Sequence, residues 1–351
     1  MTWPRQLRED AMQSRRHYSF PRTVWWSIRF LIGPFVYGAV ILGVYVALGR
    51  PEAMVVPFSV VSMLGVVVAF FVGFKNNASY GRLWEARKIW GAIVNVSRAW
   101  AITVQGFVTD EYVQQPVDDQ ELQALHRDLI LRHVAWLAAL RHHLRRRQTW
   151  EHAGRSDDAY IRSLCHECKT PMEKDLALFL DGDEVDAVTR RTNRATHLLA
   201  HQAYQLRDLK RKGFIDNWRH MELQKLLHKM FDEQGKSERI KNFPFPRQYA
   251  SFTLYSVWVL AAVLPFGLLD VFNDLATLHQ LWLLIPCGAV VSWLFFTAEL
   301  IGDYSENPFE GLWNDIPITS LSRTIEIDLK ELLDEPNLPE PIGPGYLGLV
   351  N

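Results

Sequence analysis

Two cysteines and a pair of histidines have types and spacing that could support chemistry. Cys165 and Cys168 form a single C-x-x-C, a spacing used by zinc sites and redox dithiols. No second pair stands at zinc-finger spacing, so two ordinary helix-surface thiols explain the motif better than a metal or redox site. His197 and His201 have metal-ligand spacing on a predicted helix, but the HLLAH segment lacks the internal glutamate of a zinc protease. Solvated helix histidines are the preferred interpretation.

A basic run at residues 142–147 likewise has an explanation that needs no chemistry. His142 and His143 precede Arg145, Arg146 and Arg147, and a solvated face or the acidic groups of a partner explain such a run without catalysis. The sequence contains neither G-x-x-x-x-G-K-[ST] nor G-x-S-x-G, so P-loop nucleotide enzymes and acyl-transfer enzymes have no motif support. We therefore predict no catalytic residue, no metal site and no cofactor.

Apolar side chains are strongly segregated along the chain, and this segregation predicts the helices that position the residues above. The chain has 38 basic and 39 acidic residues and a net charge of −1, which favours neither nucleic acid nor an acidic partner. Four uncharged blocks are each long enough to cross the hydrocarbon layer as a helix: Phe30–Leu48, Val55–Phe74, Tyr249–Leu269 and Leu281–Ala298. Buried core helices of a soluble protein are the alternative, and four such runs argue against it.

The polar stretch between the second and third blocks has apolar residues at helical spacing, and alternating runs are scarce. We predict an all-α protein with four transmembrane helices and a helical cytoplasmic domain. The expected parts are a cytoplasmic N-terminal segment (1–24), spans one and two (25–74, with the neck at 55–74), the cytoplasmic domain (75–248), spans three and four (249–299) and a cytoplasmic tail (300–351).

Basic residues near the spans set the expected orientation. Five arginines precede the first span, and Lys75, Arg82, Arg87 and Lys88 follow the second, while residues 270–280 contain no lysine or arginine. The positive-inside rule then places both termini and the polar domain in the cytoplasm. A multi-pass protein of the bacterial inner membrane is expected, and three cysteines suit a reducing compartment for its polar part.

The second block continues without a turn signal into a charged segment up to Trp100, so one helix is expected to leave the bilayer and continue in water. Val56, Val60 and Leu64 are spaced four apart on it, and this stripe fits either a packing face or the wall of a pore. The interiors of all four blocks lack charged residues, which weakens a proton-coupled pump. A channel needs only apolar helix faces gathered around an axis.

Three segments carry a family resemblance: FKNNASYGRLWEARKIWGAIVNVSRAW, GKSERIKNFPFP and ENPFEGLWNDIPI. Together they resemble the bacterial branch of the bestrophin family, from the first span to about Glu331. The resemblance implies a homopentameric ion channel whose second helix lines a membrane neck and whose cytoplasmic helices enclose a vestibule with a second aperture. It places Val56, Val60 and Leu64 at the neck, as hydrophobic rings.

The same resemblance suggests residues elsewhere on the ion path. Ile215 and Trp218 are the candidates for the cytoplasmic aperture, and Lys75, Asn76 and Asn77 are candidate ion contacts at the inner mouth. We expect self-association into a homopentamer, contact with the lipid bilayer and with permeant monovalent ions, and no binding of nucleic acid.

The tail departs from the pattern of calcium-gated animal members, in which a run of acids follows N-P-F and forms a calcium site. Here EGLWND follows the N-P-F at 307–309, so only scattered oxygen donors remain, such as Asn307 and Asp315. Calcium takes six to eight oxygen ligands. We therefore expect no calcium gating through this segment, with Glu306 and Asp315 acting as caps or interface partners.

Selectivity does not follow from apolar rings, which discriminate poorly by charge. By similarity we favour a monovalent cation such as sodium, with chloride as the alternative in the same architecture. The alternatives of another class are a non-conducting membrane scaffold and a metal-binding membrane protein that uses the cysteines and histidines.

Overall fold

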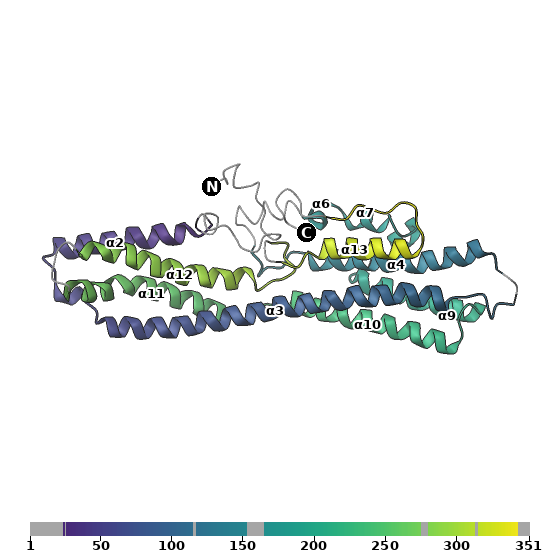
Figure 1. Ribbon diagram of the computed structural model, residues 1–351, viewed down its shortest axis with the longest axis horizontal. Helices are drawn as coiled ribbons and strands as arrows, with labels where there is room; N and C mark the ends of the chain where they lie inside the picture. The colour runs from purple at the N-terminus through teal and green to yellow at the C-terminus, as the bar shows by residue number, and fades with distance from the viewer. Residues whose placement is uncertain are drawn as a thin grey trace. The chain divides into compact units, whose positions relative to one another are not determined.

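The computed structural model of the 351-residue chain describes residues 24, 26–114, 117–152, 165–274, 280–312 and 315–342. Within these ranges the regular structure is helical throughout, which confirms the all-α prediction (Figure 1). The segment before residue 24 and the end of the tail, residues 343–351, lie outside the described residues, so the prediction of cytoplasmic termini falls outside them too.

The chain divides into two compact units, and the division differs from the five parts expected from sequence. The span unit contains the described residues up to Arg82 together with Pro244–Glu306, and the polar unit contains Leu83–Phe243 and the chain from Asn307 onward. The segment 307–342 is therefore part of the polar unit and not a separate tail.

Among the described residues, four helices are long and apolar enough to cross a membrane, as predicted. They are α2 (Arg29–Ala47), α3 (Phe58–Phe107), α11 (Arg247–Asp274) and α12 (Leu284–Tyr304, preceded by the 3-10 turn η3, Leu281–Leu283). Helices α2, α11 and α12 run side by side (Figure 1). Pro286 lies in the first turn of α12, where a proline costs no helix hydrogen bond.

Helix α3 has 50 residues and contains no proline, and its residues 58–82 belong to the span unit and 83–107 to the polar unit. At 1.5 Å per residue it is about 75 Å long. Pro57 precedes its first residue, which is the position where a fixed φ favours helix initiation. The prediction that the second span continues as one helix into the charged segment is confirmed.

The core of the span unit forms where α3 meets α11. Val61, Val68 and Val72 of α3 are buried in one cluster with Val257 and Leu260 of α11. Gly267 of α11 faces Val61 directly, because a Cβ atom at this glycine would lie 2.6 Å from Cγ2 of Val61. The glycine therefore sets how closely the two helices approach.

The polar unit packs around α4 (Asp119–Leu144), whose residues from Leu129 to Leu140 are almost all buried. The other helices are α9 (Arg194–Lys212), α10 (Asn217–Asn242), α13 (Ile318–Leu332) and three short ones, α6 (His166–Lys169), α7 (Met172–Leu176) and α8 (Gly182–Thr189). Helix α9 ends at Gly213, whose φ of 89° is the left-handed conformation that favours glycine. This turn directs the chain into α10.

Candidate pore-lining surface

Helix α3 packs against its own unit along one face only. Between Phe58 and Ala78 the buried positions are 61, 68, 72 and 75, which are three, four or seven residues apart and so share one face of the helix. On the opposite side a row of large apolar side chains is exposed: Val60, Met63, Val67, Phe70 and Phe74. A soluble helix rarely leaves such a row uncovered. Within one subunit this face is therefore available to lipid, to another subunit or to a pore.

The three predicted neck residues lie at the border of this exposed face. The side chain of Val60 is 57% exposed, whereas Val56 and Leu64 are half-buried and pack at the edge of the span-unit core. Val60 and Leu64 lie four residues apart on α3, whereas Val56 precedes the first residue of the helix, Phe58. Assigning them to a neck stays a prediction.

Two contacts with α11 fix the start of the pore-helix candidate. The backbone N–H of Phe58 donates to Oδ2 of Asp270 at 2.8 Å, and the N–H of Val56 donates to the carbonyl of Phe266 at 3.2 Å. A carboxylate at a helix N-terminus satisfies unpaired N–H groups and complements the helix dipole. Sequence reasoning missed this role of Asp270, because the residue comes from a helix far along the chain.

The three inner-mouth candidates occupy different environments. Lys75 is buried, pairs with Glu299 and lies 3.7 Å from Asp303 of α12. Asn76 donates its Nδ2–H to the carbonyl of Ala298 at 3.0 Å. Asn77 alone of the three is exposed, which is the condition for touching a hydrated ion.

The two aperture candidates also differ. Ile215 is 2% exposed and belongs to the core of the polar unit, whereas Trp218, in the first turn of α10, is 82% exposed. Met221, one turn further along α10, is likewise exposed. Sequence reasoning did not consider Met221, although its spacing of three from Trp218 places both on one helix face.

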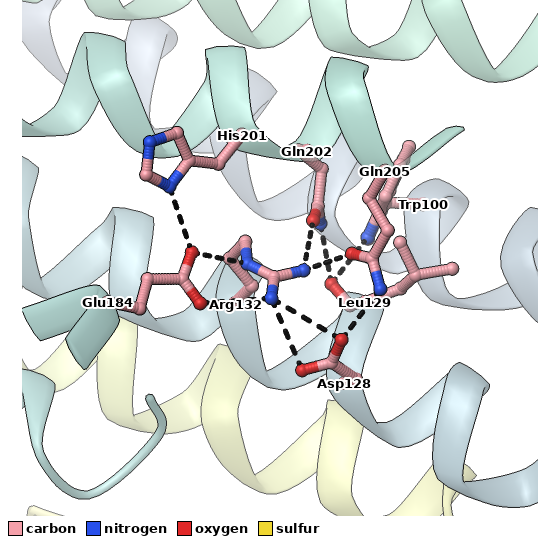
Figure 2. A network of polar contacts seen from close by, with 8 residues as sticks. All are labelled: Trp100, Asp128, Leu129, Arg132, Glu184, His201, Gln202 and Gln205. Atoms are coloured by element: carbon pink, nitrogen blue, oxygen red, sulfur yellow. Dashed lines mark hydrogen bonds and ion pairs between the residues drawn. The ribbon is translucent and has the colours of Figure 1, made fainter. Parts of the chain in front are cut away.

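His201 of the HLLAH pair belongs to a polar network around a half-buried arginine. Its Nδ1 lies 3.1 Å from Oε1 of Glu184, and Glu184 accepts hydrogen bonds from Nε and Nη2 of Arg132 at 2.7 and 3.0 Å. Figure 2 shows that the guanidinium also reaches Asp128 and the amide oxygens of Gln202 and Gln205. Burial is the largest single effect and opposes the ionised carboxylate, but the hydrogen bonds and charges of Arg132 and His201 together outweigh it and lower the pKa of Glu184. The network ties α4, α8 and α9 together.

The C-x-x-C pair lies at α6. Cys165 is buried and Cys168 is exposed, and a hydrogen bond with Cys168, together with burial, raises the pKa of the Cys165 thiol. A thiol with a raised pKa is a poor nucleophile. Among the residues that the structure describes, no group of three or more His, Cys, Asp or Glu side chains is arranged to hold a metal ion.

The segment after N-P-F folds around the side chain of Arg145. Arg145 donates from Nη1 to Oδ2 of Asp315 at 3.4 Å and from Nη2 to the carbonyl of Ile316 at 3.3 Å. The N–H of Gly311 also donates to Asp315, and Glu310 accepts from the backbone N–H of His152. Burial raises the pKa of Asp315 to about 7. Asn307 is buried as well, while Glu306 pairs with Arg247 in the span unit at 2.7 Å.

Known proteins are similar to this chain in sequence. A family model described as Bacterial/Fungal Bestrophin protein matches residues 24–331. The voltage-dependent anion channel-forming protein RSc3414 of Ralstonia nicotianae is 28% identical over 278 residues, 79% of this chain and 78% of the relative. The protein of the same description, YneE, from Escherichia coli K12 is 27% identical over 288 residues, covering 82% and 80%.

The fold is also similar to a solved structure. The crystal structure of a bacterial bestrophin homolog from Klebsiella pneumoniae superposes with a TM-score of 0.71 at 21% identity, over 88% of this chain and 99% of that one. The match of the family model covers most of the chain and includes all four candidate spans. The chain therefore belongs to the bacterial and fungal bestrophin family.

Proposed function

We propose that this chain is the subunit of a homopentameric ion channel of the bacterial inner membrane, with α3 lining the membrane neck. The observation that carries the proposal is the uncovered apolar face of α3 in a chain of this family. Copies of that face around an axis form a constriction that conducts when it is wetted and closes when it dries.

Two sides of α3 have properties that a ring of subunits requires. Val60 and the large apolar side chains in line with it face away from the core of their own unit, and Val56 and Leu64 flank that row. A second exposed side carries small residues, Ser62, Ala69 and Gly73. Small residues let neighbouring helices approach closely within a membrane. In the proposed pentamer the small side contacts the next subunit and the apolar row faces the axis.

For the second constriction we propose the exposed start of α10. Trp218 and Met221 present bulky apolar surface outside the core of the polar unit, and Ile215 takes part in that core. The aperture is therefore assigned to Trp218, with Met221 one turn away. Exchanging Trp218 for alanine should enlarge this constriction and raise the permeability to large ions.

For the charge of the permeant ion we propose an anion. The relatives named above are described as anion channel-forming, and the sequence-based preference for sodium has no support in those names. On α3, Arg87 and Lys88 are exposed, whereas the charge of Lys75 is balanced by Glu299. Exposed positive charge near a pore mouth raises the local concentration of anions.

The reversal potential tests conduction and selectivity together. Purified protein in a planar bilayer with asymmetric NaCl should carry current whose reversal potential lies near the chloride equilibrium potential. A value near the sodium equilibrium potential would show that the permeant ion is a cation. Absence of current from folded protein that is inserted in the bilayer would contradict the channel and favour a scaffold. Native mass spectrometry should show five copies, and a different count would contradict the ring.

The neck assignment has its own variants. Val60→Ala and Leu64→Ala should widen the constriction and raise single-channel conductance, because each removes apolar bulk from every subunit of the ring. Val66→Ala is the matched control, since it deletes the same atoms as Val60→Ala from the side of α3 that carries the small residues. A larger effect of Val66→Ala than of Val60→Ala would show that the other side of α3 faces the axis.

A further inference from the structure

The polar unit contains a cavity that the proposed ion path does not use. Its volume is about 430 Å³, and it is formed by the end of α4, by α6 and α7, and by the start of α9. Small-molecule sites typically measure about 300–1,000 Å³. The lining contains six side chains with N–H or O–H donors: His142, His143, Arg145, Arg146, Thr192 and Arg194. Of these, Arg145 already binds Asp315 and Ile316, and His142 binds Asp175.

The acidic groups in and beside the cavity are largely engaged elsewhere. The carboxylate of Glu167 pairs with Arg141 at 2.6 Å and accepts from Oγ1 of Thr319 at 2.7 Å, and Asp175 holds His142 at 2.8 Å. Glu173 is the one other carboxylate in the lining, and it is exposed.

The guanidinium groups of Arg146 and Arg194 have N–H donors that do not bind these carboxylates. Among the described residues, no carboxylate forms an ion pair with Arg146 or with Arg194. Arg194 uses its Nε–H on the carbonyl of Thr189 at 3.1 Å, so its two terminal nitrogens remain. A guanidinium offers paired N–H donors whose spacing matches two phosphate oxygens.

Apart from the hydrogen bond to Thr189 at the end of α8, the position of Arg194 in its own helix is unfavourable for a cation. It is in the first turn of the 19-residue helix α9, where the dipole disfavours a positive charge and favours an anion. The basic run at the end of α4 is different, since cations at a helix C-terminus stabilise the helix by themselves. Arg146 and Arg194 thus line the same cavity from two helices. The dipole of α4 favours a cation at the position of Arg146, whereas the dipole of α9 disfavours one at Arg194.

The pKa of His143 responds to the charges around the cavity. Burial lowers its pKa, and Arg146, Lys241 and Arg194 lower it further, while Glu238 opposes them. Three cations and one carboxylate, Glu238, therefore act on the imidazole, and Glu238 has the largest effect of the four. A bound anion would relieve this repulsion and favour the protonated ring.

We propose that this cavity binds the phosphoryl group of a small anionic ligand, with Arg146 and Arg194 as the principal contacts and His143 as a third donor. The cavity lies within the polar unit, and the proposal does not depend on conduction or on the sign of the permeant ion. The phosphoryl group belongs either to a soluble phosphate compound or to a lipid headgroup, which share this chemistry.

Calorimetry with inorganic pyrophosphate tests the site in the full chain in nanodiscs of zwitterionic lipid. Arg146→Gln and Arg194→Gln should each weaken binding roughly 10- to 100-fold, as expected for the loss of charge-assisted hydrogen bonds. Arg147→Gln and Arg191→Gln are matched controls, because both arginines are exposed neighbours that do not line the cavity. They should leave the affinity within about twofold.

Chemical footprinting gives a readout at the site itself. Pyrophosphate should protect His143 from diethyl pyrocarbonate in the unaltered protein and in both controls, and not in the Arg146→Gln and Arg194→Gln variants. No binding heat at millimolar pyrophosphate, no protection of His143, or equal weakening by the control substitutions would each overturn the proposal. With anionic lipid in the nanodisc, a weaker pyrophosphate affinity identifies a competing headgroup and an unchanged affinity identifies a soluble ligand; both support the phosphoryl assignment.

Discussion

Replacing Glu299 by glutamine tests how strongly α12 holds the neck helix. The side chains of Lys75 and Glu299 are 1% and 7% exposed, so the substitution leaves a buried ammonium without its closest counter-charge. Removing one partner of such a pair costs about 3–5 kcal/mol. Because Asp303 lies 3.7 Å from the same ammonium, we expect the lower end of this range. At about 2–4 °C per kcal/mol for a unit of this size, the melting temperature should fall roughly 6–12 °C.

The assay is thermal unfolding in detergent, read by intrinsic tryptophan fluorescence. Asp208→Asn is the control, because Arg207 and Asp208 form an ion pair with both side chains about half exposed, and such pairs contribute about 0–1 kcal/mol. The double variant Lys75→Met/Glu299→Gln should recover most of the loss, since neither side chain of the buried pair is then charged and Asp303 is partly exposed. If Glu299→Gln melts within the range of Asp208→Asn, the buried pair does not hold α3 and the reasoning is refuted.

Two further substitutions test contacts described above. Gly267→Ala should lower the melting temperature and alter conductance, because its Cβ would lie 2.6 Å from Val61 and must move α3. Gly43→Ala in α2, which has open space around it and lies outside α3, should be tolerated; equal tolerance of both would contradict the close approach. Asp315→Asn should change how stability depends on pH: the folded-state pKa of Asp315 is raised from 3.8 to about 7, so its contribution is complete below the ordinary value and is lost as pH rises through about 7. Melting temperatures in mildly acidic and mildly alkaline buffer should therefore differ less in Asp315→Asn than in the unaltered protein, and an unchanged difference would assign the titration to another group.

Sequence reasoning predicted the helices well because their causes are local. An uncharged run of about 20 residues and the absence of proline after Pro57 are properties that composition and spacing reveal. The four spans and the continuous α3 follow from them. The ends differ by a few residues, since Asp270 belongs to α11 and not to a connecting loop.

The partners of single side chains were much harder to predict, because they depend on packing between distant segments. Lys75 finds its counter-charge 224 residues along the chain, so its position after a span suggested an exposed ion contact. Ile215 follows the turn at Gly213 that directs it into the core, and nothing in its own neighbourhood distinguishes it from the exposed Trp218. The cavity between α4 and α9 likewise joins Arg146 and Arg194, which no sequence motif connects.

The network around Arg132 limits the motions open to the polar unit. Its guanidinium binds one acceptor on α8 and two on α9 while anchored on α4 (Figure 2). A slide of α9 by one helical turn would break the bonds to Gln202 and Gln205 and leave the guanidinium with Glu184 of α8 and Asp128 of its own helix as its acceptors. Helix-by-helix ratcheting is thus costly here, and any change of state in this unit is expected to proceed by movement of α4, α8 and α9 as a single body.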